Sequence, residues 1–162
     1  MSLRIPLGLA VTMALTTLGP RTTRATLLVP SATTERAARA AAVIVGRVDS
    51  TRVAWEGQRI VTYSLVATER VLVGAAAPRL EVVTPGGTID GIGMRVLGGP
   101  DLRRGSRSVL FLSAEPGDGA HHILDLHDGA LAIERGDDGV DLVRDETGRL
   151  RAVSELAAEL TR

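Results

Sequence analysis

Hydrophobic and polar residues alternate along residues 59–74, and this stretch predicts one long strand. Val61, Tyr63 and Leu65 occupy alternate positions, with polar residues such as Thr62 between them. A period of two is typical of a strand that buries one of its faces. A strand of this length has to bend, and long bent strands are characteristic of small closed barrels.

Shorter stretches with strand patterns flank it on both sides. The apolar centre of residues 107–113 is almost continuous, so we expect that strand to be central and buried on both faces. The pair Glu56-Gly57 predicts a hairpin leading into the long strand, and Asp128-Gly129 predicts a second hairpin. The second hairpin would join strands at 121–125 and 130–134; the other predicted strands cover 42–54, 79–84, 94–97 and 140–143.

Two stretches have helix patterns, one at each end of the strand-rich region. Ser31 stands as an N-cap before residues 32–41, which are rich in alanine and carry Glu35 in the first turn. At the other end, residues 152–160 place a set of apolar residues on one helical face: Val153, Leu156, Ala157 and Leu160. We expect the first helix to lie across a barrel end and the second to seal the domain.

These elements together predict an all-β fold with two short helices. The expected architecture is a small closed antiparallel barrel of the OB type, with an N-terminal helix, an added C-terminal hairpin and a closing C-terminal helix. A length of 162 residues suits one domain with a single core, which we assign to residues 26–162.

Residues 1–25 predict a secretory signal peptide. Arg4 supplies a short positive start, an apolar run follows over residues 5–19, and Thr23-Arg24-Ala25 provides a small-residue cleavage site. A run of about 15 apolar residues is shorter than the ~20 needed to cross a bilayer. We therefore expect a secreted or periplasmic protein with no membrane span after cleavage.

Composition narrows the functional classes. Aromatic residues make up only 2% of the chain, namely Trp55, Tyr63 and Phe111, so valine, leucine, isoleucine and alanine must fill the core. All 19 basic residues are arginine, and loss of the signal peptide removes three of them, which leaves 16 against 19 acidic residues and a formal charge of −3. This acidic balance and the few aromatic residues argue against nucleic acid as a partner. The absence of cysteine excludes disulfides, thiolate zinc sites, cysteine nucleophiles and a lipoprotein anchor.

Two loops are the candidate contact surface. One is the turn at residues 55–58, and the other is the glycine-rich stretch at 85–93, which has no Gly-Lys-Ser/Thr ending and no following helix and so does not predict a phosphate site. Trp55 either packs as a cap on the barrel end, the more common use of a lone tryptophan, or faces solvent as a contact residue. The candidate contact residues are Trp55, Glu56, Gly57, Gln58, Pro85, Gly86, Gly87 and Ile92.

The residue patterns predict no catalytic residues, no metal site and no cofactor. His121 and His122 would point to opposite faces of a strand and so would not share a metal; with His127, they are interpreted as solvent-facing. The acidic turn at Asp137-Asp138, with Asp141, lacks the oxygen spacing and closing glutamate of a calcium loop. No Gly-x-Ser-x-Gly elbow or paired catalytic motif occurs in the sequence. We therefore predict a protein that is not an enzyme.

The strand sequences AAVIVGRVDS, TYSLVATERVLVG, LEVVTPGG and GSRSVLFLS resemble those of uncharacterised secreted bacterial proteins. In outline they also look like the netrin-like modules of the tissue inhibitors of metalloproteinases, which have an OB-type barrel. That resemblance implies a wedge-shaped inhibitor whose disulfide-held N-terminal cysteine chelates the protease zinc. This chain has no cysteine, and cleavage after Ala25 would leave Thr26 first, so the resemblance carries over the fold and not the activity.

The leading functional hypothesis is an exported, non-catalytic binding module. Loops at one end of the barrel would contact an unknown partner, either a protein or a glycan. The first alternative is a metalloprotease inhibitor, which rests on the resemblance. The second is an enzyme whose site combines residues distant in sequence, and a cleft joining His121 or His122 to carboxylates would favour it.

Overall fold

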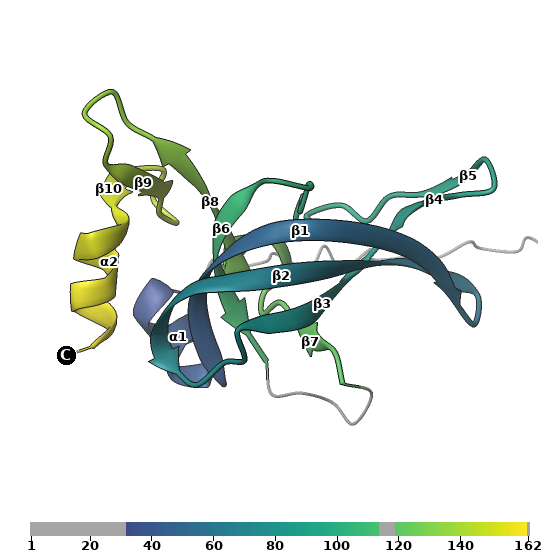
Figure 1. Ribbon diagram of the computed structural model, residues 1–162, viewed down its shortest axis with the longest axis horizontal. Helices are drawn as coiled ribbons and strands as arrows, with labels where there is room; N and C mark the ends of the chain where they lie inside the picture. Colours follow the sequence, from purple (N-terminus) through teal and green to yellow (C-terminus); the bar gives the residue numbers. More distant parts are fainter. Residues whose placement is uncertain (1–31, 114–118, 162) are drawn as a thin grey trace, which may run out of the picture.

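Two long strands form the centre of the main sheet. β1 (Ala42–Glu56) and β2 (Arg59–Gly74) pair antiparallel along their lengths, with three register shifts that bend the pair. The computed structural model describes residues 32–113 and 119–161. Gly57 starts the turn between the strands with a φ of 58°, which glycine adopts without steric cost. The predicted long strand and its hairpin are confirmed (Figure 1), but its expected buried face is wrong: Leu65 is 38% exposed, whereas its neighbours Ser64 and Val66 are fully buried.

Six further strands extend this pair into one eight-stranded sheet, and the other two strands form a separate two-stranded sheet. β7 runs parallel to β3, and the other neighbouring strands in this sheet run antiparallel, so the sheet is mixed. The strands beyond β1 are β6 (Arg107–Leu112), β8 (Ala130–Arg135), β9 (Asp141–Arg144) and β10 (Leu150–Ala152), and those beyond β2 are β3 (Arg79–Pro85) and β7 (His121–His122).

The predicted closed OB-type barrel is wrong. Closure requires the two edge strands of a sheet to pair, whereas the edges of this sheet are β10 and β7, which lie at opposite ends of the strand order. The chain just after β7 meets the end of β6 through an isolated bridge between Leu112 and Ile123, without a ladder. Sequence alternation predicts that a segment is a strand but does not determine which strands become neighbours. Here the C-terminal strands continue the sheet outward beyond β6.

The predicted hairpin around Asp128-Gly129 is also wrong. Of the predicted strand at 121–125, only His121–His122 forms a strand, and Asp125 and Leu126 have φ values of 53° and 55°. The chain then forms a 3₁₀ helix, η1 (Leu126–Gly129). β8 pairs with β6 and β9 instead of β7, so tertiary strand pairing overrides the local turn signal.

A different Asp-Gly pair does form a hairpin turn. β4 (Gly87–Ile89) and β5 (Ile92–Met94) pair across Asp90 and Gly91, whose φ values are 52° and 79°. Two consecutive positive φ values are characteristic of a type I′ turn, which favours Asp-Gly. The segment at 85–93, predicted as a loop, therefore contains a small hairpin, and the strand predicted at 94–97 ends at Met94.

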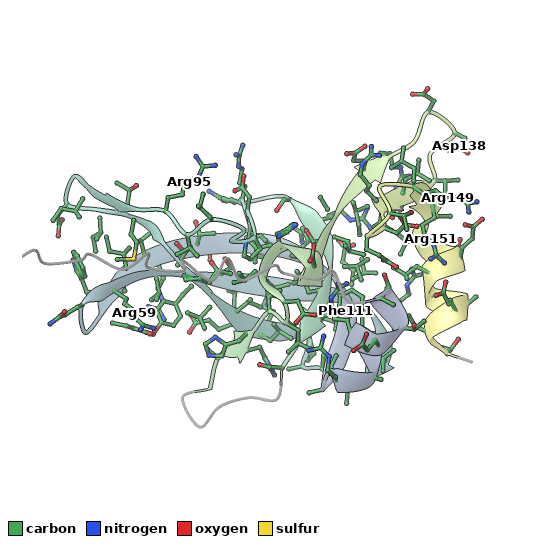
Figure 2. The ribbon with its side chains drawn as sticks, turned by 180° about the vertical axis from the view of Figure 1, so that it is seen from behind. Arg59, Arg95, Phe111, Asp138, Arg149 and Arg151 are labelled. Atoms are coloured by element: carbon green, nitrogen blue, oxygen red, sulfur yellow. The ribbon has the colours of Figure 1, made fainter. Side chains whose placement is uncertain are left out.

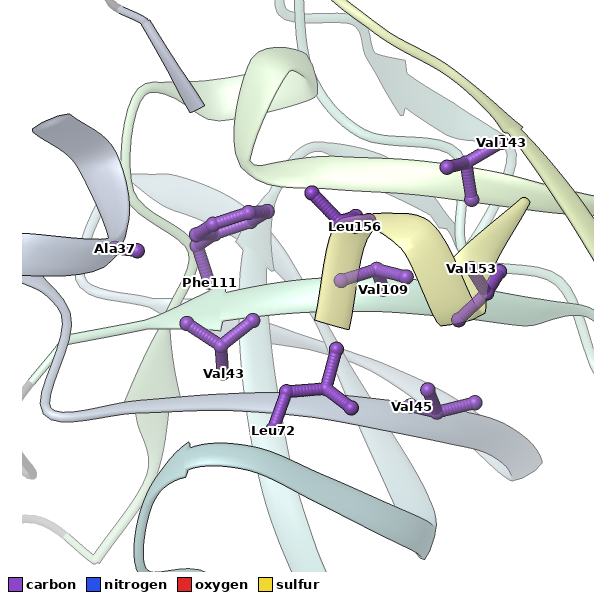
Figure 3. Close-up of a cluster of buried hydrophobic side chains, with 9 residues drawn as sticks. All are labelled: Ala37, Val43, Val45, Leu72, Val109, Phe111, Val143, Val153 and Leu156. Atoms are coloured by element: carbon purple, nitrogen blue, oxygen red, sulfur yellow. The ribbon is translucent and has the colours of Figure 1, made fainter. Parts of the chain in front are cut away.

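β1 is buried on both faces near its start. Val43 and Val45 face one cluster of buried residues, while Ala42 and Ile44 face another. β6 is buried in the same way, which confirms the prediction that it is central. Figure 3 shows the first cluster, which consists of Ala37, Val43, Val45, Leu72, Val109, Phe111, Val143, Val153 and Leu156.

Two helices contribute to the first cluster and lie at one end of the molecule (Figure 1). α1 (Thr33–Arg39) follows Ala32, which forms no side-chain cap, and the predicted cap Ser31 lies outside the described residues. α2 (Val153–Leu160) buries the predicted stripe, because Val153 and Leu156 are buried and Ala157 and Leu160 pack beside them.

A buried arginine links α1 to this core. The Arg36 side chain is 1% exposed, and its guanidinium carbon lies 5.4 Å from the centre of the Phe111 ring. Its Nε donates a hydrogen bond to Asp125 at 3.2 Å. Because burying an unpaired charge costs several kcal/mol, this pairing is required for the arginine to lie in the core.

Arg107 on β6 lies between two carboxylates. Its Nη1 donates to Asp141 on β9 at 2.9 Å, and its Nε donates to Glu69 on β2 at 2.8 Å. These hydrogen bonds raise the pKa of Arg107. The hydrogen bond from Arg107 in turn lowers the pKa of the Asp141 carboxyl below its ordinary value.

We expect Asp141→Asn to lower the melting temperature near neutral pH and to have much less effect near pH 3. A carboxyl group whose pKa is lowered by folding stabilises the folded state above its unfolded pKa of about 3.9, and this contribution is lost as the pH falls through the folded value. Thermal unfolding of both proteins across this pH range measures the effect. Asp137→Asn, an exposed residue of the preceding turn, is the control. A difference in melting temperature that stays constant with pH would contradict the prediction.

Candidate functional site

Two hairpins project from the molecule at the end opposite the helices (Figure 1). One is the tip of β1 and β2, from Trp55 to Arg59, and the other is the β4–β5 hairpin. We call these two hairpins, together with Pro85 and Gly86 where β3 leads into β4, the distal end. The contact residues predicted from sequence, at 55–58, 85–87 and 92, all fall within it.

Gly86 and Gly87 hold the second hairpin against β2. The Gly86 N–H donates to the Ile60 carbonyl at 2.8 Å, and Thr62 Oγ1 donates to the Gly86 carbonyl at 2.8 Å. A Cβ atom at Gly87 would lie 2.7 Å from Cγ1 of Val53, so a larger residue does not fit there without a shift. Gly86 is buried and Gly87 partly buried. These two predicted contact residues therefore take part in the packing of the hairpin, and both also line a polar cavity.

Trp55 and Ile92 expose large apolar side chains at the distal end. Their side chains are 45% and 54% exposed, and Leu97, just beyond β5, is 87% exposed. The interpretation of Trp55 as a packed cap is therefore wrong, and the solvent-facing alternative holds. Exposed apolar side chains that gather in one region are a common property of binding surfaces.

An apolar cavity of about 620 Å³ lies at the distal end. Its walls come from the tip of β1–β2, the end of β3, the segment 94–100 and the chain after β7. Cavities of roughly 300 to 1,000 Å³ are typical of small-molecule sites. Six of its apolar lining residues are Ile60, Val61, Val83, Val96, Ile123 and Leu126.

A more polar cavity of about 450 Å³ adjoins the first. Its polar lining includes Arg95, Asp101 and Arg103, of which the last two form an ion pair. Residues common to both cavities are Thr84, Pro85, Met94, Val96 and Pro100. The segment 94–100 therefore forms a shared wall, and Pro85 is a predicted contact residue that lines both cavities.

Glu56 and Arg59 lie at the apolar cavity, opposite each other in the β1–β2 register. Glu56 accepts a hydrogen bond from the Tyr63 hydroxyl, which raises the pKa of that hydroxyl. Arg52 covers the Tyr63 ring, with its guanidinium carbon 3.6 Å from the ring centre. Arg59 forms no ion pair or side-chain hydrogen bond with another residue of the described part of the chain. Arg59 is thus a cation available to a ligand.

Figure 2 shows where the labelled arginines lie. Arg59 and Arg95 are on the two hairpin regions of the distal end, while Arg149 and Arg151 lie near α2 at the other end. Arg95 lines the polar cavity and Arg59 lines the apolar cavity. The two arginines therefore give each cavity its own positive charge.

Of the three histidines, His122 is the one that lines the apolar cavity. His121 is partly buried with its Nδ1 3.2 Å from the Ser113 carbonyl, and the exposed His127 contacts Asp128. Over residues 32–113 and 119–161, no group of three or more His, Cys, Asp or Glu residues is placed to hold a metal ion. His122 and Glu56 line the same cavity, but they form no ion pair with each other.

Most of the cavity lining has no signal in the sequence. In the sequence pattern Arg59 only begins a strand, and nothing connects Val96, His122 and Leu126 to the contact loops. Their side chains come from segments far apart in the sequence, so no local motif joins them. The one available local signal was Asp90-Gly91, which predicts the hairpin that brings Met94 to the cavity.

Comparison with models of protein families, with curated proteins and with solved structures gives no match to this chain. The netrin-like resemblance therefore stays a prediction. None of the helices in the described ranges is long and apolar enough to cross a membrane.

Proposed function

We propose that this protein is an exported, non-catalytic binding module whose ligand places an apolar group in the apolar cavity of the distal end. The observation that carries this proposal is the cavity itself, about 620 Å³ in volume and surrounded by four separate segments of the chain. Concave and mostly apolar pockets with a few polar groups are the usual form of ligand sites. Trp55 and Ile92 extend the apolar surface of the same end toward solvent.

The cavity lining favours an apolar ligand group over a sugar. Each sugar hydroxyl that loses water without a new hydrogen bond costs about 1–3 kcal/mol. The described lining of this cavity includes Val61, Val83 and Ile123 and none of the tryptophan, tyrosine or phenylalanine rings on which sugars usually stack. A small molecule, or an apolar side chain of a partner protein, suits this lining better than a glycan.

The protease-inhibitor alternative has less support. It depends on an OB-type barrel, which the open sheet replaces. It also depends on the α-amino group of Thr26, which lies outside the described residues. A cavity at the end of two hairpins supports binding of a ligand by this protein rather than insertion of this protein into an enzyme.

We expect the neutral dye N-phenyl-1-naphthylamine to bind saturably to the purified protein, with a rise in its fluorescence. Val96→Phe should weaken this binding by about tenfold, equivalent to about 1.4 kcal/mol, because the larger side chain fills space in the shared wall. Val96 is only partly buried, so the protein has room to fold around the larger residue.

Val71→Phe is the matched control for this experiment. Val71 lies on β2, is 39% exposed and is not among the residues that line the cavity. It should bind the dye as the unchanged protein does. Equal binding by both variants, or dye binding that does not saturate, would count against the distal end as the ligand site.

A further inference from the structure

We propose that the apolar cavity binds an anionic amphiphile, namely a hydrocarbon chain that carries a single carboxylate, and that Arg59 holds the carboxylate. This inference rests on the proposed function and adds to it the chemical class of the ligand. It follows from two features of the cavity, an apolar interior and one uncommitted cation.

The expectation that the ligand has a hydrocarbon chain comes from the residues that line the apolar cavity. Ile60, Val61 and Val83 are buried or nearly so, and these aliphatic residues form part of the cavity lining. Ile123 and Leu126 line the cavity from the chain after β7. A flexible aliphatic chain gains affinity with each methylene that it buries against such walls. Such a chain also needs no hydrogen bonds from the residues that line the cavity.

The expectation that the ligand carries a carboxylate comes from Arg59, a cation at the cavity. Glu56 faces Arg59 across the hairpin and would be its natural partner, yet the Glu56 carboxylate accepts the Tyr63 hydroxyl and forms no ion pair with Arg59. A guanidinium presents two parallel N–H donors that match the two oxygens of a carboxylate. His122 lines the same cavity, and a ring N–H of histidine can donate a further hydrogen bond.

The neighbouring arginine on β1 is not available for this role. Arg52 donates to both oxygens of Glu81, at 3.0 and 3.1 Å, and its guanidinium covers the Tyr63 ring. Arg95 is at the same end of the molecule but lines the polar cavity (Figure 2). Arg59 is therefore the arginine that lies where an apolar chain and a charged head group would meet.

The experiment follows the fluorescence of Trp55, the single tryptophan of the chain, which lies on the hairpin tip beside Glu56 and pairs with Ile60, two residues that line the cavity. The purified protein is titrated with dodecanoate, dodecanol and dodecylammonium, which share one chain and differ in the charge of the head group. We expect dodecanoate to bind at least about tenfold more tightly than dodecanol, and dodecylammonium to bind more weakly still.

Substitutions distinguish a direct contact between Arg59 and the carboxylate from the effect of the overall electrostatic potential of the protein. Arg59→Gln should weaken dodecanoate binding by about tenfold and leave dodecanol binding unchanged. Arg95→Gln removes the same charge from the same end and should have little effect. Glu56→Gln should strengthen dodecanoate binding, because it removes a negative charge beside the head group.

Equal affinities for dodecanoate and dodecanol, or equal losses from Arg59→Gln and Arg95→Gln, would overturn the assignment of the carboxylate to Arg59. So would a failure of dodecanoate to bind. In each case, saturable binding of the neutral dye, with its loss in Val96→Phe, would still support the proposed function. Failure of the dye experiment as well would show that the distal end is not a ligand site.

Discussion

Replacing Phe111 with alanine should lower the free energy of unfolding by about 3–5 kcal/mol. Phe111 is fully buried on β6 and packs with residues of both helices, including Ala37 and Leu156, in one core cluster (Figure 3). It is the single phenylalanine in a chain with 2% aromatic residues, so no other ring can fill the space. Its loss also leaves the buried Arg36 guanidinium without the ring that it contacts. Urea denaturation followed by circular dichroism measures the change.

Phe111→Leu is the control for this prediction. Leucine retains most of the buried apolar volume and should cost less than about 1.5 kcal/mol, as volume-conserving substitutions usually do. A Phe111→Ala variant whose stability lies within about 1 kcal/mol of the unchanged protein would show that the helices do not depend on this ring.

Replacing Gly129 with alanine is the second change with a large expected effect. A Cβ atom there would lie 1.8 Å from the Leu124 carbonyl oxygen and 2.8 Å from Cγ2 of Ile123. The oxygen belongs to the backbone, so the chain around η1 has to move, and we expect a loss of about 3 kcal/mol or more. Ile123 and Leu126 line the apolar cavity, so dye binding should fall together with stability.

Gly93→Ala is the control that tests whether the loss of stability in Gly129→Ala comes from the close packing at position 129. A Cβ atom at Gly93 meets only Thr88 Oγ1, at 3.5 Å, which is an ordinary contact. This variant should stay within about 0.5 kcal/mol of the unchanged protein in chemical denaturation. Similar losses in both variants would mean that the tight approach of Gly129 to Leu124 does not stabilise the fold.

The candidate site could be predicted only in part. The turn residues after Trp55 predict the hairpin tip that the structure confirms, and Ile92 is exposed, while the role of both as contacts stays a prediction. Gly86 and Gly87 allow a close approach of chains and also line the polar cavity, and their role as contact residues stays a prediction. Arg59 could not be recognised, because its importance comes from the engagement of Glu56 with Tyr63.

Local patterns in the sequence were sufficient to predict the extent of β2, the double burial of β6 and the apolar stripe of α2, but not which face of β2 is buried. These features depend on the geometry of neighbouring residues, in which side chains alternate along a strand and recur every three to four positions on a helix. The order of the strands, the open sheet and the parallel pairing of β7 were decided by tertiary structure. They depend on contacts between distant segments, which the period of a single segment does not encode. The apolar cavity belongs to this second group, because its walls exist only once β3, the segment 94–100 and the chain after β7 have packed around the tip of the long hairpin.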